Sequence, residues 1–199
     1  SLQGQPVAAM NPDARRRLGW HFVPEERLGR GAVPSLSLAA NLLLTRNEAV
    51  AQSGLRGLLG WLDIHALRAQ AQGIIDQYRV KASGPDASAR SLSGGNLQKF
   101  IVGREIEAQP KVLIVSQPTW GVDVGAAAQI RAALVALRDA GCAVLVISEE
   151  LDELFELCDR MHVMAQGRLS ASLSREQATV AKIGSWMSGL WSSAEETVN

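Results

Sequence analysis

Short apolar runs alternate with amphipathic segments over the second half of the chain. Residues 112–115 (VLIV) and 143–147 (AVLVI) are continuous apolar runs of strand length, and residues 126–140 between them have helical spacing followed by Gly141. Continuous apolar strands separated by helices are typical of a parallel sheet that is covered by helices. We therefore predict an α/β fold whose ligand sites lie at the carboxyl ends of the strands.

The middle of the chain, residues 34–107, is predicted to be helical. Ser37 precedes an apolar run at residues 38–44, and residues 62–78 carry apolar side chains at helical spacing. These patterns indicate an α-helical subdomain next to the α/β part.

Two shorter patterns flank these zones. Near the front, an apolar run at residues 21–23 ends at Pro24. Residues 15–17 (RRR) could contact a phosphate, but we expect them to be the solvated start of a strand. Further on, residues 161–164 and 168–171 flank a Gln-Gly turn and predict a β-hairpin.

Composition argues against several classes of protein. The 199 residues contain 20 Lys and Arg against 20 Asp and Glu, so the basic excess of a typical nucleic-acid-binding protein is missing. No apolar stretch approaches the roughly 18 residues that a membrane-spanning helix needs.

The three histidines lie far apart in sequence, and Cys142 and Cys158 lack the spacing of metal ligands. We predict no metal site and two buried, reduced thiols in a cytoplasmic chain.

Residues 91–99 (SLSGGNLQK) are the most informative stretch. Ser93 can cap a helix that runs to about residue 107, and Gly94 and Gly95 remove side chains from its first turn. Bare N–H groups at the positive end of a helix dipole favour an anion. An ordinary capped helix with two glycines explains these residues as well, so the stretch alone leaves both interpretations open.

Further motifs surround this stretch in a fixed order. Residues 23–31 (VPEERLGRG) and 36–41 (LSLAAN) precede it, whereas residues 112–125, 144–150 and 183–189 follow it. Together they resemble the ATP-binding proteins of ABC transporters, with the LSGGQ signature in the LSGGN form of sugar and nucleoside importers. The resemblance is to the second, C-terminal nucleotide-binding domain. It implies a partial P-loop NTPase core of the α/β class, with a largely parallel sheet and an inserted helical subdomain.

The resemblance also implies three segments. Residues 1–33 correspond to the front of the core up to the Q-loop, residues 34–107 to the helical signature subdomain, and residues 108–199 to the core with the Walker B, D-loop and switch regions. The Walker A P-loop is absent, because none of the four lysines follows a glycine. We therefore expect a truncated chain that cannot hold ATP by itself.

Four positions of the implied catalytic site are altered. Ser116 and Gln117 stand where the family has an Asp-Glu pair; a hydroxyl is a weaker Mg²⁺ ligand than a carboxylate, and glutamine cannot act as a general base. Glu149 stands at the switch histidine and would repel a γ-phosphate, and Glu25 stands at the Q-loop glutamine. We expect a disabled half-site and a chain that is inactive alone, although drift among loop residues is the alternative.

The resemblance implies that the signature acts in trans. Domains of this family pack head to tail, so Ser93, Gly94, Gly95 and Asn96 would contact ATP held by a partner nucleotide-binding domain of the same parent chain. Asp123 on the D-loop would cross the same interface. ATP and Mg²⁺ are expected only in the complete parent assembly, which would be an ATPase of the translocase type.

The helical subdomain would dock a transmembrane permease, which places the parent complex peripherally on the inner face of the cell membrane. The apolar residues that could make this contact, or could simply be helical core, are Leu42, Leu43, Leu44, Leu55, Leu58, Leu59 and Trp61. Trp120, beside the D-loop, fits either an interface contact or simple packing.

Two alternative functions stay open. A soluble, non-transport ABC protein that acts on DNA or the ribosome fits less well, since sustained heptads and a basic balance are missing. A regulatory module that works without nucleotide gains from the missing P-loop. Removing the central P-loop strand would leave sheet edges exposed, so we also expect self-association or a locally rearranged sheet.

Overall fold

The computed structural model describes residues 2, 4–46 and 63–190 of the 199-residue chain. The chain divides into two compact units, Ser1–Ile147 and Ser148–Asn199, and each is described by itself. The predicted segment boundaries after residues 33 and 107 both fall inside the first unit and stay a prediction.

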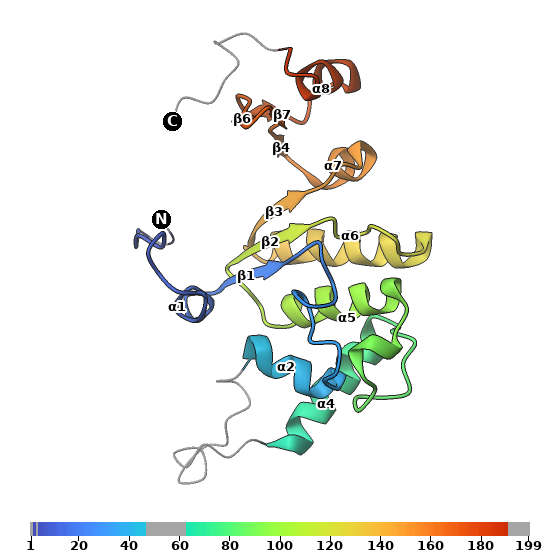
Figure 1. Ribbon diagram of the computed structural model, residues 1–199. Helices are drawn as coiled ribbons and strands as arrows, with labels where there is room; N and C mark the ends of the chain where they lie inside the picture. The colour runs from blue at the N-terminus through green and yellow to red at the C-terminus, as the bar shows by residue number, and fades with distance from the viewer. Residues whose placement is uncertain (1, 3, 47–62, 191–199) are drawn as a thin grey trace. The chain divides into compact units, whose positions relative to one another are not determined.

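The first unit is built on a three-stranded parallel sheet (Figure 1). β2 (Val112–Ser116) is the central strand, between β1 (Trp20–Val23) and β3 (Ala143–Ile147). Val23 pairs with Val115, and Ser116 pairs with Ile147. Because all three strands run in the same direction, their carboxyl ends lie at one edge of the sheet, as the apolar runs predicted.

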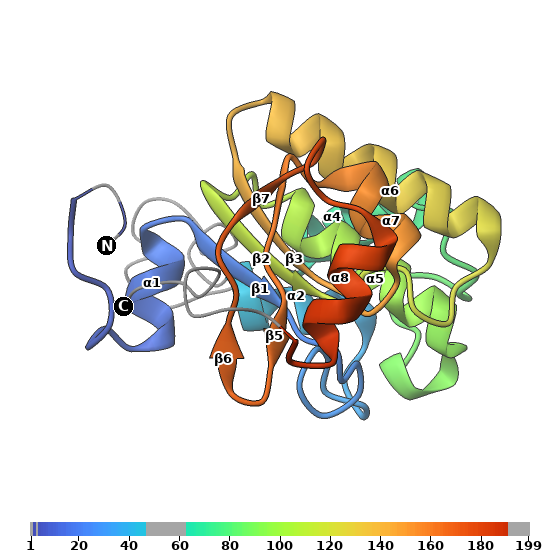
Figure 2. The same cartoon turned by 90° about the horizontal axis from the view of Figure 1, so that it is seen from above.

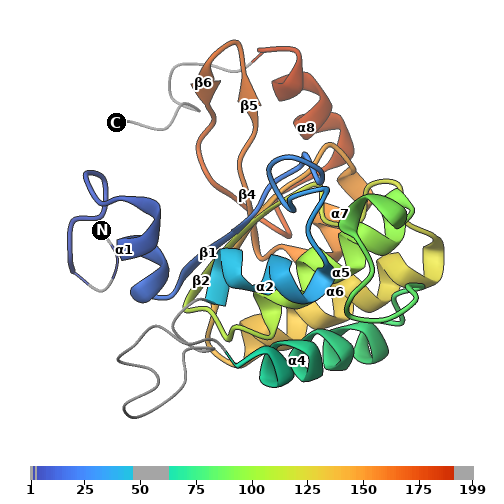
Figure 3. The ribbon, with the colours of Figure 1, turned by 60° about the horizontal axis from the view of Figure 1, so that its bottom comes forward.

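Helices form two further layers of this unit. α5 (Gly94–Ile106) and α6 (Val124–Asp139) lie on the same face of the sheet (Figure 1), and Gly141, with a φ of +96°, follows the end of α6. α2 (Leu38–Arg46) and α4 (Ile64–Gln77) lie side by side, and α4 packs against α5 (Figure 3). The α/β fold with a parallel sheet and covering helices is thereby confirmed.

Residues 15–17 are helical, so the expectation that they begin a strand is wrong. They form the last turn of α1 (Pro12–Arg17), which lies directly before β1 (Figure 2). The Asn11 side chain accepts a hydrogen bond from the Ala14 N–H at 2.8 Å, and proline occupies the first helical position. This cap and the N1 proline start a helix where apolar periodicity gave no signal.

The helical layer of α2 and α4 begins at side-chain caps. The Ser37 hydroxyl accepts a hydrogen bond from the Ala40 N–H at 3.0 Å, and the Asp63 carboxylate accepts one from the Ala66 N–H at 2.9 Å. Of the apolar residues predicted to dock a permease, Leu42 is buried, Leu43 is half-buried and Leu44 is 45% exposed. Leu55, Leu58, Leu59 and Trp61 lie outside the described residues. In the described part, none of the helices is both long enough and apolar enough to cross a bilayer.

A buried charge cluster joins α1, β1 and α5. The fully buried Glu105 carboxylate accepts hydrogen bonds from Arg16 at 3.0 Å and Arg104 at 2.9 Å, and lies 2.7 Å from His21 Nδ1. Burial by itself would raise the pKa of Glu105, but the charge of Arg104, the hydrogen bond from His21 and the charge of Arg16 lower it to about 2. The carboxylate is therefore charged and fully paired inside the protein.

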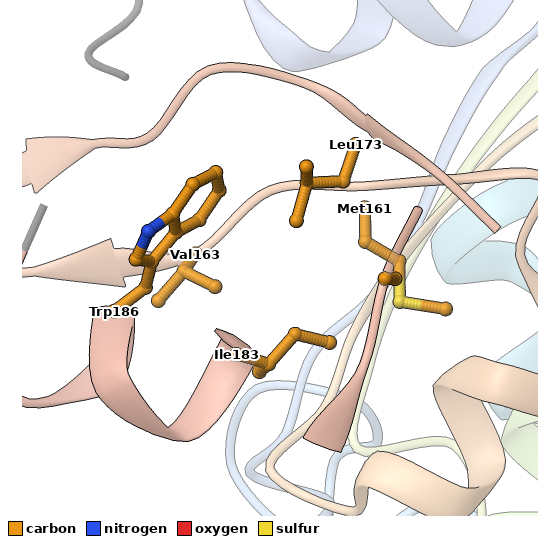
Figure 4. Close-up of a cluster of buried hydrophobic side chains, with 6 residues drawn as sticks. Met161, Val163, Leu173, Ile183 and Trp186 are labelled. Carbon is orange, nitrogen blue, oxygen red and sulfur yellow. The ribbon is translucent and has the colours of Figure 1, made fainter. Parts of the chain in front are cut away.

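The second unit has its own small core. It contains α7 (Leu151–Leu157), the strand pairs β4 (Arg160–Met161) with β7 (Leu173–Ser174) and β5 (Met164–Ala165) with β6 (Arg168–Leu169), and α8 (Val180–Met187). Figure 4 shows Trp186 and Ile183 of α8 among Met161, Val163 and Leu173. Cys158 is half-buried, not buried as expected.

The predicted hairpin is present but differs from the prediction in its pairing. Its turn is at residues 166 and 167 as predicted, and only two residues pair on each side of it. The Val163 N–H then donates to the Ser170 side chain at 2.8 Å, and β4 pairs with β7 beyond this point. Between the β4–β7 pair and the β5–β6 pair, two residues (162 and 163) lie opposite three (170–172). This one extra residue shifts the register, as in a β-bulge.

Replacing Gly103 with alanine is expected to destabilise the first unit. A Cβ atom there would lie 2.7 Å from the Tyr78 ring and 3.0 Å from Ile74 Cγ2, so the contact between α4 and α5 would be overpacked at a cost of about 1–3 kcal/mol. Gly73→Ala is the matched control, since a Cβ atom there has no neighbour within 4 Å. It should stabilise α4 by about 0.5–1 kcal/mol. Urea unfolding of both variants tests the pair, and equal effects would contradict the packing.

The charge cluster predicts acid sensitivity. Because the pKa of Glu105 is lowered to about 2 from its ordinary value of 4.5, its stabilising contribution is complete above about pH 4.5 and is lost as the pH falls toward 2. Glu105→Gln should remove this dependence and also cost about 3–5 kcal/mol at neutral pH, because Arg104 loses its buried anion. Unfolding free energies measured across this window test it. Glu26→Gln, which alters an exposed ion pair with Arg30, should leave the dependence unchanged.

Candidate functional site

Three segments converge at the carboxyl edge of the sheet. They are the loop that follows β1 (residues 24–33), the first turn of α5, and the loop between β2 and α6 (residues 117–123). A Cβ atom on Gly95 would lie 3.1 Å from the Gly121 carbonyl oxygen and 3.4 Å from Val122 Cα. The start of α5 therefore packs directly on the backbone of the loop before α6.

Ser93 caps α5 as its sequence predicted. Its hydroxyl accepts hydrogen bonds from the Asn96 backbone N–H at 3.5 Å and from the Asn96 side-chain amide at 2.9 Å. Asn96 Oδ1 in turn accepts a hydrogen bond from the Lys81 N–H at 2.9 Å. Ser93 and Gly94 are exposed, so a ligand can reach this helix end. Asn96 fixes the orientation of the Ser93 hydroxyl.

The altered catalytic positions lie at neighbouring strand ends. Ser116 ends β2, and Gln117 follows with a φ of +50° and donates its backbone N–H to the Ile147 oxygen at 2.7 Å. Glu25 is exposed, two residues beyond β1. Glu149 is exposed and belongs to the second unit. The structure thus brings three of the four positions to one sheet edge.

The residues at this edge are weak ligands for a divalent cation. Ser116 and Gln117 offer a neutral hydroxyl and a neutral amide, which bind Mg²⁺ less well than anionic oxygens do. In the ranges 4–46 and 63–190, no group of three or more His, Cys, Asp or Glu side chains is arranged to hold a metal ion.

Asp123 caps α6. Its carboxylate accepts a hydrogen bond from the Ala126 N–H at 2.9 Å, and this bond is the main cause that lowers the pKa of the exposed Asp123 side chain. Lys99 lies on α5, and its ammonium donates to the Arg79 carbonyl at 2.6 Å. Burial lowers the pKa of Lys99, although the charge of Asp123 raises it. The start of α5, which carries the signature turn (residues 93–96), and the start of α6, which follows the D-loop (the loop at residues 117–123), are both fixed by side-chain caps.

Arg27 is the functional candidate that the sequence patterns missed. Its Nε donates to Gln98 Oε1 at 3.0 Å, a second donor contacts the Trp120 carbonyl, and its guanidinium lies over the Trp120 ring at 5.3 Å from the centroid. Burial lowers the pKa of Arg27. Trp120 is 59% exposed, so it covers Arg27 and is not part of the core. No local pattern of residues indicates Arg27, because its partners Gln98 and Trp120 lie far from it along the chain.

Relatives of similar sequence are named as import ATP-binding proteins. No protein-family model matches the chain. It is 38% identical to the ribose import ATP-binding protein RbsA 1 of Rubrobacter xylanophilus, over 92% of this chain and 36% of that protein. It is 36% identical to the guanosine import ATP-binding protein NupO of Bacillus subtilis, over 95% of this chain and 36% of that protein. The nucleoside import ATP-binding protein NupA of Lactococcus lactis is 41% identical, over 84% of this chain and 32% of that protein. The chain spans about a third of the length of these relatives.

Solved structures show the same fold. An ATP-binding subunit of an ABC transporter aligns with a TM-score of 0.69 at 16% identity, over 93% of this chain and 74% of that chain. The dimeric, post-hydrolysis structure of the ATP-binding cassette MJ0796 bound to ADP and Pi aligns with a TM-score of 0.65 at 16% identity, over 84% of this chain and 68% of that chain. The chain therefore has the same α/β fold as these ATP-binding proteins of ABC transporters.

Proposed function

Since this chain is homologous to the ATP-binding proteins of ribose and nucleoside importers of the ABC type, we propose that its signature turn binds ATP held by a partner nucleotide-binding domain. The signature turn consists of residues 93–96. One observation carries the proposal: the capped, glycine-opened start of α5 is exposed to a ligand. Its free N–H groups and helix dipole favour a phosphate.

Each residue of the signature turn has a distinct role in this proposal. The Ser93 hydroxyl and the N–H groups at Gly94 and Gly95 contact the γ-phosphate, while Asn96 holds Ser93 in position through its 2.9 Å hydrogen bond. Asp123 holds the D-loop at the start of α6 and faces the same partner. ATP and Mg²⁺ are bound by the partner domain, and this chain completes their site.

The half-site of this chain itself is disabled in this proposal. Ser116 and Gln117 supply no anionic metal ligand and no general base, and both lie at the strand ends where such groups are needed. Glu25, two residues beyond β1, adds negative charge that repels a triphosphate. The assembly therefore hydrolyses ATP at one site only.

The energy of that site would serve transport. The relatives are named as import proteins, which supports an assembly with transmembrane permease subunits at the cytoplasmic face of the cell membrane. In the helical layer, Leu44 and Ile64 are exposed and suit an apolar contact with a permease. A soluble, non-transport ABC protein remains the second candidate by sequence, but no feature of the site favours it.

The free edge of β3 supports self-association when the chain is isolated. Among the described strands, β3 pairs with β2 alone, and Leu145 and Ile147 on it are 54% and 50% exposed. These two side chains lie on one face of the sheet, and the unpaired backbone edge of β3 beside them can recruit a further strand. Size-exclusion chromatography with light scattering should show a dimer or larger species, and Leu145→Lys should shift it toward monomer. A clean monomer for the unchanged chain contradicts this part of the proposal.

The central test blocks the signature turn. In the assembly that contains both this chain and the P-loop domain, Ser93→Tyr should lower ATP hydrolysis by about 100-fold, because the bulky ring keeps the phosphate from the donors of α5. Ser185→Tyr, at an exposed serine on α8, is the matched control and should hydrolyse ATP normally. Hydrolysis that persists undiminished in Ser93→Tyr would overturn the assignment.

A further inference from the structure

We propose that Arg27 is a positioning residue that fixes the signature turn and the D-loop relative to each other. The inference rests on the proposed function, because both segments would act on the same partner-held ATP. Arg27 comes from a third segment, the loop that follows β1, and reaches both of them with one side chain.

The first set of contacts holds the start of α5. Arg27 Nε donates to Gln98 Oε1 at 3.0 Å, and a Cβ atom on Gly94 would lie 2.7 Å from Arg27 Nη1. Any side chain at Gly94 would therefore displace the guanidinium. Gly94 therefore leaves room for a contact within this chain, independently of any phosphate.

The second set of contacts holds the loop before α6. The guanidinium donates to the Trp120 carbonyl and lies over the Trp120 ring. A Cβ atom on Gly121, whose φ is +64°, would lie 3.4 Å from Arg27 Nη2. A single planar group thus packs between the backbone of the D-loop and the backbone of the signature turn.

Gln98 provides a second connection between the same two segments. It is buried, and its side-chain amide donates to the Pro118 carbonyl at 3.0 Å and the Gln117 carbonyl at 3.3 Å. Its oxygen is the acceptor for Arg27. Arg27 therefore also orients the Gln98 amide: the oxygen faces Arg27, and the NH2 group faces the loop before α6.

The backbone of Arg27 is itself held in place. The Ala32 N–H donates to the Arg27 carbonyl at 2.7 Å, and the Gly31 N–H donates to the Glu26 carbonyl at 3.0 Å. A Cβ atom on Gly31 would lie 2.9 Å from Ile101 Cδ1, so this closed loop packs on α5. The backbone that carries the Arg27 side chain is therefore held in one position.

Arginine suits this position better than any other side chain. Its planar fork donates in two directions and stacks on an aromatic ring, whereas the point charge of lysine cannot do both. Displacement of a site residue by about 1 Å can cost up to about 100-fold in rate. Loss of Arg27 should therefore slow hydrolysis at the partner's site even though Arg27 does not touch the substrate.

The test measures ATP hydrolysis in the assembly of this chain with its P-loop domain. Arg27→Ala should lower kcat by at least about 10-fold, and low-millimolar guanidinium ion should restore a large part of it by refilling the site. Arg27→Lys should be slow as well and should not respond to guanidinium. Arg30→Ala is the matched control: this arginine is 76% exposed, pairs with Glu26, and should have normal activity with or without guanidinium.

The outcomes separate the two proposals. Normal activity in Arg27→Ala, or a loss that guanidinium does not restore, overturns the positioning role, because a residue needed only for folding would not be rescued by a denaturing ion. If Ser93→Tyr is inactive while Arg27→Ala is normal, the positioning role alone fails. If Ser93→Tyr keeps its activity, the proposed function itself fails.

Discussion

Helix α5 is buried from Leu97 to Ile106, and the first unit is organised around the polar side chains that this burial encloses. A buried polar or charged group destabilises the fold unless it is paired. Glu105 is paired with Arg16, Arg104 and His21, and Gln98 is paired with Arg27 and the loop before α6. Arg104 belongs to α5 itself, and the other partners come from α1, β1 and the loops at the sheet edge. Pairing them fixes where each of these segments lies.

The same constraint explains the glycines of the signature turn. Gly94 admits the Arg27 guanidinium and Gly95 admits the Gly121 carbonyl, so both positions are small because segments of this chain approach them closely. A phosphate ligand would need the same bare backbone. The close packing and the proposed ligand contact thus require the same residues, and the packing presents the helix start in a fixed position.

The charges around the sheet edge are distributed unevenly. Cationic and donor groups at the start of α5 come from Arg27 and the N–H groups of the signature turn, next to the Asp123 carboxylate that caps α6. The neighbouring strand ends carry a neutral Ser116 and Gln117, and the exposed Glu25. Such a division suits a domain that completes a partner's nucleotide site and lacks a working one of its own. It is also consistent with homology to import ATP-binding proteins.

The sequence by itself determined the features that arise from neighbouring residues. Apolar runs located β2 and β3, and Ser93 located the start of α5, because strand burial and helix capping act over a few residues. Only the tertiary structure identified Arg27, which contacts Gln98 and Trp120, 71 and 93 residues away along the chain. It likewise paired His21 with Glu105, 84 residues away along the chain. Contacts of this kind depend on how the layers pack, and no local pattern of residues encodes that.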